Sequence, residues 1–282
     1  MKNLFILMVS IVALSIISCS KDDSLVETSS ESVILPKRIV ETTTNTNTTN
    51  IITSTLKYNG NKLLEINYPD EKILLTYTGD LITKIVSYRR ATILFTTEYQ
   101  YENNKLKTVI NTEDSNPSFI SKTKTIYIHN TDGTILEEEY NINSTTGIET
   151  KTNRSSLNTY ANGNLVKTIY TAIYTSTTTD SNITTINYEY DVKNNPYKNI
   201  LGFSQLLDSL QFLINLNNAT KRTSFSQSTT NGTVNPPSTP TFTNYTFLYN
   251  SNNYATEEKY NFSTFSNNVE TIKTITTQYF YE

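Results

Sequence analysis

Tyr58-Asn59-Gly60-Asn61-Lys62-Leu63 carries the signals of a tight turn between two β-strands. Asn and Gly tolerate the positive φ angles that tight hairpin turns require. The flanking segments are rich in Thr, Ile, Val and Tyr, which fit the pleated, half-buried surface of a strand. The stretch therefore predicts an antiparallel hairpin in which the tyrosine before the turn packs on the leucine after it.

The same unit recurs along the chain, and its recurrence predicts the fold class. Further copies are Tyr77-Thr78-Gly79-Asp80-Leu81, Tyr101-Glu102-Asn103-Asn104-Lys105-Leu106, Asn130-Thr131-Asp132-Gly133-Thr134-Ile135, Tyr160-Ala161-Asn162-Gly163-Asn164-Leu165, Tyr190-Asp191-Val192-Lys193-Asn194-Asn195 and Tyr249-Asn250-Ser251-Asn252-Asn253-Tyr254. A solenoid would hold a fixed period, whereas the spacing here varies, as an antiparallel meander allows. We expect an all-β fold over residues 33–282: one large, curved antiparallel β-meander of about a dozen strands, with closure into a barrel-like shape as one outcome.

Residues 200–216 break the strand pattern. Apolar side chains recur there at three- and four-residue spacing, at Phe203, Leu206, Leu207, Leu210, Leu213 and Ile214. This periodicity predicts one short amphipathic helix, with Pro196 before it and Asn217-Asn218 after it as stops. Because such an apolar stripe is normally buried, we expect the helix to cover an open end or face of the sheet. A partner-binding or gating helix is the alternative.

The first nineteen residues have the layout of an export signal. Lys2 precedes an apolar run from Leu4 to Ile17, which is too short for a comfortable transmembrane helix. Ile16-Ile17-Ser18-Cys19 resembles the bacterial lipobox, and it contains the chain's single cysteine. The resemblance implies a signal peptide over 1–18 and lipid attachment at Cys19. An ordinary signal with a chance cysteine is the alternative.

The residues after the cysteine predict a tether and its destination. Residues 20–32 are polar and Ser-rich, so residues 19–32 are expected to be the lipidated Cys19 and a flexible tether. Ser20-Lys21-Asp22-Asp23 resembles the export tag of Bacteroidota lipoproteins, which implies an outer-membrane location and display at the cell surface. The periplasmic face is the alternative. Two or more acyl chains on Cys19 would give stable membrane anchoring.

The repeated tyrosine–turn–leucine units resemble the YD repeats of Rhs-type proteins. Together with the lipobox they resemble Bacteroidota cell-surface lipoproteins with a porin-like β-meander domain, most clearly at Tyr188–Tyr197 and Leu35–Ile39. The irregular period and the lack of Asp after most of the tyrosines depart from YD repeats, so a closed Rhs-like shell is not implied. The resemblance brings no catalytic activity and no cofactor.

Composition excludes several kinds of chemistry. One His and one Cys cannot build a zinc site of the usual kind, and no intrachain disulfide can form. With a net charge of −3 and only sparse basic pairs, such as Arg89-Arg90, we expect no nucleic-acid partner. We also expect no metal and no cofactor, because no phosphate-binding or calcium-loop spacing occurs.

The candidate catalytic groups are assigned structural roles. His129 follows a strand-like segment and is expected to be a solvent-facing turn residue. Glu137-Glu138-Glu139 is expected to be a solvated edge strand with Glu137 and Glu139 on one face. Asp70-Glu71 and Glu257-Glu258 are expected to be surface acids. No catalytic residues are therefore predicted.

The sequence favours a non-enzymatic lipoprotein that binds a ligand or scaffolds an envelope assembly. Its partners would be the membrane, through the lipid anchor, and a glycan or protein ligand, since Tyr side chains suit sugar or peptide recognition. One alternative is a carbohydrate-active hydrolase, which needs two carboxylates of unequal environment in a deep cleft. The other is an integral outer-membrane β-barrel, which needs an outward apolar band.

Overall fold

The computed structural model describes residues 33–45, 48–114, 120–174, 180–207, 215–266 and 269–281. These residues belong to one compact unit, Val33–Glu282. The predicted signal peptide over 1–18, Cys19, the Ser20-Lys21-Asp22-Asp23 tag and the tether lie outside the described residues. Nothing among the described helical residues has the length and apolar character needed to cross a membrane.

Seventeen strands and one short helix are present in the described residues. They are β1 (Arg38–Thr44), β2 (Thr49–Asn59), β3 (Lys62–Asn67), β4 (Glu71–Thr78), β5 (Leu81–Arg89), β6 (Thr92–Glu102), β7 (Lys105–Glu113), β8 (Ser121–His129), β9 (Ile135–Ile142), β10 (Glu149–Ala161), β11 (Asn164–Ile173), β12 (Ser181–Tyr190), η1 (Phe203–Gln205), β13 (Ala219–Thr230), β14 (Thr233–Val234), β15 (Thr241–Tyr249), β16 (Ala255–Ser266) and β17 (Val269–Phe280).

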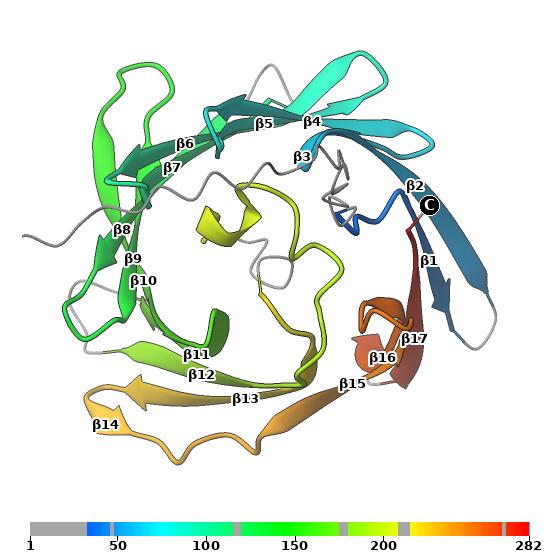
Figure 1. The fold of residues 1–282 in the computed structure, drawn as a ribbon. Helices are drawn as coiled ribbons and strands as arrows, with labels where there is room; N and C mark the ends of the chain where they lie inside the picture. The colour runs from blue at the N-terminus through cyan, green and yellow to red at the C-terminus, as the bar shows by residue number, and fades with distance from the viewer. Residues whose placement is uncertain are drawn as a thin grey trace, which may run out of the picture. The chain divides into compact units, whose positions relative to one another are not determined.

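The strands form one antiparallel sheet that closes on itself (Figure 1). Each strand pairs with the next along the chain, except that β13 pairs with both β14 and β15, so that the two-residue β14 stands outside the ring. β1 pairs with β2 on one side and with β17 on the other. The result is a closed barrel of 16 strands, which confirms the all-β meander and adds its closure.

The two ends of the barrel differ. One end, which we call the turn end, holds the short turns between β2 and β3, β4 and β5, β6 and β7, β10 and β11, and β15 and β16. The opposite end, the loop end, holds the connections between β1 and β2, β3 and β4, and β5 and β6, together with longer ones such as that between β9 and β10.

A segment between β12 and β13 lies inside the ring of strands (Figure 1), and its hydrogen bonds place it at the turn end. We call the described residues 191–207 and 215–218 of this segment the plug. The Leu201 amide donates to the Asn61 carbonyl at 2.9 Å, and the Tyr77 hydroxyl donates to the Leu201 carbonyl at 3.2 Å. The plug is thus hydrogen-bonded to the hairpin turn that follows β2 and to the end of β4.

The amphipathic helix predicted over 200–216 is not formed in residues 200–207. Gly202 is left-handed at φ 82°, a single 3₁₀ turn covers Phe203–Gln205, and Leu206 is extended. Residues 208–214 lie outside the described part. The expectation that this segment covers an end of the sheet is confirmed, because Phe203, Leu206 and Leu207 are buried in the barrel.

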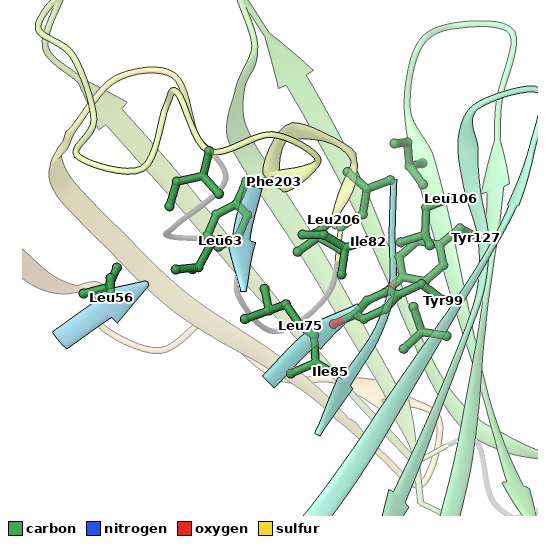
Figure 2. Close-up of a cluster of buried hydrophobic side chains, with 14 of the residues drawn as sticks. Leu56, Leu63, Leu75, Ile82, Ile85, Tyr99, Leu106, Tyr127, Phe203 and Leu206 are labelled. Carbon is green, nitrogen blue, oxygen red and sulfur yellow. The ribbon is translucent and has the colours of Figure 1, made fainter. Parts of the chain in front are cut away.

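The core lies between the plug and one side of the barrel wall (Figure 2). Phe203 and Leu206 of the plug face Leu63 and Ile82 of the wall. The cluster continues through Leu56, Leu75, Ile85, Tyr99, Leu106, Val109, Tyr127 and Ile135 on β2 to β9. Burial of these side chains, at about 25 cal/mol per Å² of apolar surface, supplies the main free energy that holds the plug in place.

The tyrosine before each turn has a second role that the sequence did not reveal. Tyr58 pairs with Leu63 and Tyr101 with Leu106, as predicted, and a β-bulge follows each pair. A bulge leaves backbone groups without a ladder partner. The Tyr101 hydroxyl donates to the Ile82 carbonyl at 2.8 Å, and that of Tyr190 donates to the Leu165 carbonyl at 2.6 Å. The tyrosine of one hairpin therefore donates a hydrogen bond to a backbone carbonyl at the bulge of the preceding hairpin.

His129 occupies the corresponding position at the end of β8. It is half-buried, and its Nε2 lies 2.8 Å from the Leu106 carbonyl oxygen. The prediction of a solvent-facing turn residue is wrong, because the ring takes the place of a bulge-capping tyrosine.

Candidate functional site

A cavity of about 790 Å³ occupies the part of the barrel interior that the apolar core leaves free. It lies against β1, β2, β15, β16 and β17, and Tyr197 of the plug contributes to its wall. Exposed residues such as Asn50, Ile51 and Asp70 belong to its lining, so it opens to solvent at the loop end. Its lining is Ile39, Glu41, Asn50, Ile51, Ile52, Ser54, Tyr68, Pro69, Asp70, Glu71, Tyr197, Tyr245, Glu258, Tyr260, Thr277 and Tyr279.

Strand alternation and register bring the cavity side chains to one face. On β1, Ile39 and Glu41 point inward with Val40 between them. Glu41 pairs with Thr277 of β17, and Thr277 pairs with Glu258 of β16. The two glutamates therefore share one cross-strand row, and two strand spacings place their backbones about 9–10 Å apart.

Tyrosine rings make up much of the cavity wall. Tyr245 and Tyr260 are cross-strand partners with ring centroids 5.0 Å apart. Tyr279 meets Tyr197 edge-on at 6.0 Å, and Tyr197 stacks on Phe203 of the plug at 6.3 Å. The plug thus fixes the position of one wall of the cavity as well as closing the turn end.

Glu258 is the most perturbed carboxyl group of the cavity. Burial raises its pKa, the hydrogen bond from the Tyr279 hydroxyl lowers it, and the charge of Glu41 raises it again. The Tyr279 hydroxyl oxygen lies 3.0 Å from Glu258 Oε2. The net effect raises the pKa of Glu258 above its ordinary value, whereas Glu41 lies at an exposed position. The cavity thus holds two acids in unequal environments.

Basic side chains are absent from the cavity lining as the described residues define it. Glu71, at the rim, is paired with Arg89 (Nη2 to Oε1, 2.5 Å). Lys273 lies over the ring of Phe262, and Arg222 acts on Tyr188 and Tyr245, but neither lines the cavity. The cavity surface is therefore aromatic and acidic.

The structure corrects two predictions about acidic residues. Glu258 is not a surface acid, because it faces the cavity, and Glu71 lies at the rim beside exposed Asp70. Glu137-Glu138-Glu139 is not an edge, because β9 pairs with β8 and β10 in a closed barrel. Its alternation is as predicted: Glu137 accepts a hydrogen bond from buried Asn158, while Glu138 pairs with Lys151 on the opposite face.

A second polar cluster has a structural role. Asp191 accepts hydrogen bonds from the backbone of Lys193 and Asn218 and from the Tyr249 hydroxyl. It thereby ties the two ends of the plug to β15. Across the described residues, no group of three or more His, Cys, Asp and Glu side chains is arranged to hold a metal ion.

The outer face of the barrel carries ion pairs around its circumference. Cross-strand pairs point away from the core at Lys57–Glu65 (2.7 Å), Lys84–Glu98 (3.6 Å), Lys124–Glu149 (2.8 Å), Lys151–Glu138 (2.5 Å) and Lys221–Glu189 (3.0 Å). Lys84 and Lys124 lie in the middle of their strands. The outward face thus carries charged pairs in the middle of two strands, together with exposed apolar side chains such as Ile183, Phe242 and Ile272.

Comparison with known proteins identifies the fold. No protein-family model and no curated protein matches the sequence. The chain is similar to a porin-like protein from Bacteroides vulgatus, with 12% identity, 88% of this chain and 99% of that chain covered, and a TM-score of 0.53. A porin-like protein from Bacteroides uniformis gives 11% identity, coverage of 88% and 98%, and a TM-score of 0.47. At this identity the first likeness shows a porin-like barrel fold, and it does not support the likeness to YD repeats.

Proposed function

We propose that this barrel is a non-enzymatic binding protein of the outer membrane, held by lipid on Cys19 and standing outside the bilayer. The cavity is its ligand site, because it is large, open at one end and lined by rings with a few polar groups. The tag at Ser20-Lys21-Asp22-Asp23 favours the cell surface over the periplasmic face.

The observation that carries this proposal is the set of ion pairs on the outer face. A lipid-facing barrel has an outward apolar band, and a Lys or Arg at its midplane costs about 2–4 kcal/mol. Lys84 and Lys124 point outward in the middle of their strands, each beside a glutamate. In water the same pairs cost nothing, because exposed ion pairs contribute about 0–1 kcal/mol.

An integral outer-membrane barrel is the second candidate. The likeness to a porin-like protein supports it more directly than it supports a lipid-anchored scaffold. The plug and the apolar core argue against an open channel, since porins have a polar, water-filled lumen.

A hydrolase that uses two carboxylates also keeps a specific observation in its favour. Glu41 and Glu258 meet the requirement for two acids of unequal environment in one cavity. The test is to incubate the protein with a panel of glycans and measure the reducing ends that are released. If the wild type releases them and Glu258→Gln does not, the protein is a hydrolase and not a binding protein.

Fractionation with and without the acylated thiol tests the proposal. In the native host, wild-type protein is expected in the outer membrane and Cys19→Ser in the soluble fraction. Purified protein starting at Ser20 should be monomeric in detergent-free buffer. Membrane retention of Cys19→Ser, combined with a detergent requirement, would establish the integral barrel instead.

A further inference from the structure

We propose that the cavity binds an organic cation, with its ammonium group held between Glu41 and Glu258 and against the tyrosine rings. The inference rests on the proposed binding function and names the chemical class of the ligand.

The first argument is uncompensated charge. Within the described ranges, neither Glu41 nor Glu258 has a Lys or Arg within ion-pair distance, although nine other acidic residues do. Glu258 is partly buried, and such a carboxylate is normally paired because burial of an isolated charge is costly, whereas Glu41 is exposed. A cationic ligand would supply the missing partner, whereas the two glutamates would repel an anionic ligand.

The second argument is the aromatic wall. Tyr245 and Tyr260 lie on one side of Glu258, and Tyr279 and Tyr197 on another. Ring faces attract ammonium groups electrostatically, most strongly where water is excluded. Carboxylates and tyrosine rings around one cavity form the combination that recognises a quaternary or primary ammonium group.

The third argument is a hydroxyl in the cavity lining without a hydrogen-bond partner. Ser54 lines the cavity opposite Ile39 of β1, and its residue surface is only 4% exposed. No hydrogen bond to its hydroxyl occurs in the described part of the chain. Because a hydroxyl can both donate and accept, this group is available to a polar group of the ligand.

Binding and proton release are coupled at Glu258. The groups that act on it are Glu41 of β1 and Tyr279 of β17, while Tyr197 of the plug and Tyr245 and Tyr260 feel its charge. Lys273 and Arg222 face inward on neighbouring strands outside the cavity. A cation favours ionised Glu258, so its affinity should rise with pH through the pKa of Glu258 and then level off.

The experiment is calorimetric titration of the purified chain starting at Ser20 with choline and with its neutral isostere 3,3-dimethylbutan-1-ol. We expect choline to bind and the isostere to bind at least about tenfold more weakly. Glu258→Gln and Glu41→Gln should each weaken choline binding about tenfold or more. Glu257→Gln, on the outward face of the same strand, should leave it unchanged, and thermal unfolding checks that each variant is folded.

Failure of the inference differs from failure of the proposed function. Equal affinity for choline and the isostere, no choline binding, or choline binding that is insensitive to both glutamate variants would overturn the cation site. If a neutral sugar instead binds and Tyr260→Ala abolishes that binding, the cavity remains a ligand site and only the ligand class is wrong.

Discussion

Tyr190 illustrates how a single hydroxyl stabilises this barrel. Its hydroxyl donates to the Leu165 carbonyl of the neighbouring strand, where a bulge interrupts the ladder. Tyr190→Phe should lower the free energy of unfolding by about 1–2 kcal/mol, because the carbonyl loses its donor. Urea unfolding measures the change. Tyr174→Phe is the matched control, because Tyr174 is 65% exposed, and an equal loss there would refute the bulge-capping role.

Glu258 should make the stability of the barrel fall as pH rises. Its pKa is raised in the folded protein by burial and by Glu41, so folding favours the neutral acid. That stabilisation is fully present below the unfolded pKa and is lost as pH rises through the folded pKa. Glu258→Gln should therefore be more stable than wild type at pH 8, with the difference vanishing below about pH 4.5. Thermal unfolding of both proteins across this pH range measures the difference in stability. A difference that grows toward low pH would contradict the prediction.

Gly202 joins the plug to the barrel wall. Its φ of 82° is left-handed, and an added Cβ would lie 3.0 Å from the Asp80 carbonyl oxygen and 3.1 Å from Ile82 Cγ1. Gly202→Ala should cost about 1–3 kcal/mol from backbone strain, and more from this crowding. Gly133→Ala is the matched control, because Gly133 has a φ of 85° with nothing within 4 Å. If Gly202→Ala and Gly133→Ala lower the free energy of unfolding equally in denaturant titrations, close contact between the plug and the wall does not contribute to the cost.

The plug also shows where periodicity is reliable. The apolar spacing of residues 200–216 correctly predicted burial, since Phe203 and Leu206 lie in the core. It did not predict the backbone, because a left-handed Gly202 and an extended Leu206 bring these side chains to the core without an α-helix in residues 200–207. The apolar spacing therefore predicts which side chains are buried, whereas the backbone conformation that buries them depends on the turn at Gly202.

The turn signals in the sequence predict the strands, but they do not predict that the barrel closes. Six of the seven predicted turn units mark a hairpin, so most of the meander follows from local signals, whereas the unit that begins at Tyr190 leads into the plug. Closure depends on pairing Arg38 with Phe280, near opposite ends of the domain, and no local pattern encodes that register. The cavity is a consequence of closure, because it is the β1–β17 pairing that brings Glu41 and Glu258 into one row.

The effect of the outward lysines on the stability of the barrel depends on whether water or lipid surrounds it. Replacing Lys84, Lys151 and Lys221 together by Leu should change the free energy of unfolding in detergent-free buffer by no more than about 1 kcal/mol per site, because each forms an exposed pair. A lipid-facing barrel would instead gain about 2–4 kcal/mol from the change at Lys84, in the middle of β5, and less at Lys151 and Lys221, which lie near the ends of their strands. Three new leucines facing water should also promote self-association, which light scattering detects. A variant with the same three lysines changed to Gln controls for the lost charge, and it should stay monomeric. If the Leu variant is more stable than wild type in detergent micelles but not in buffer, the barrel is an integral membrane protein.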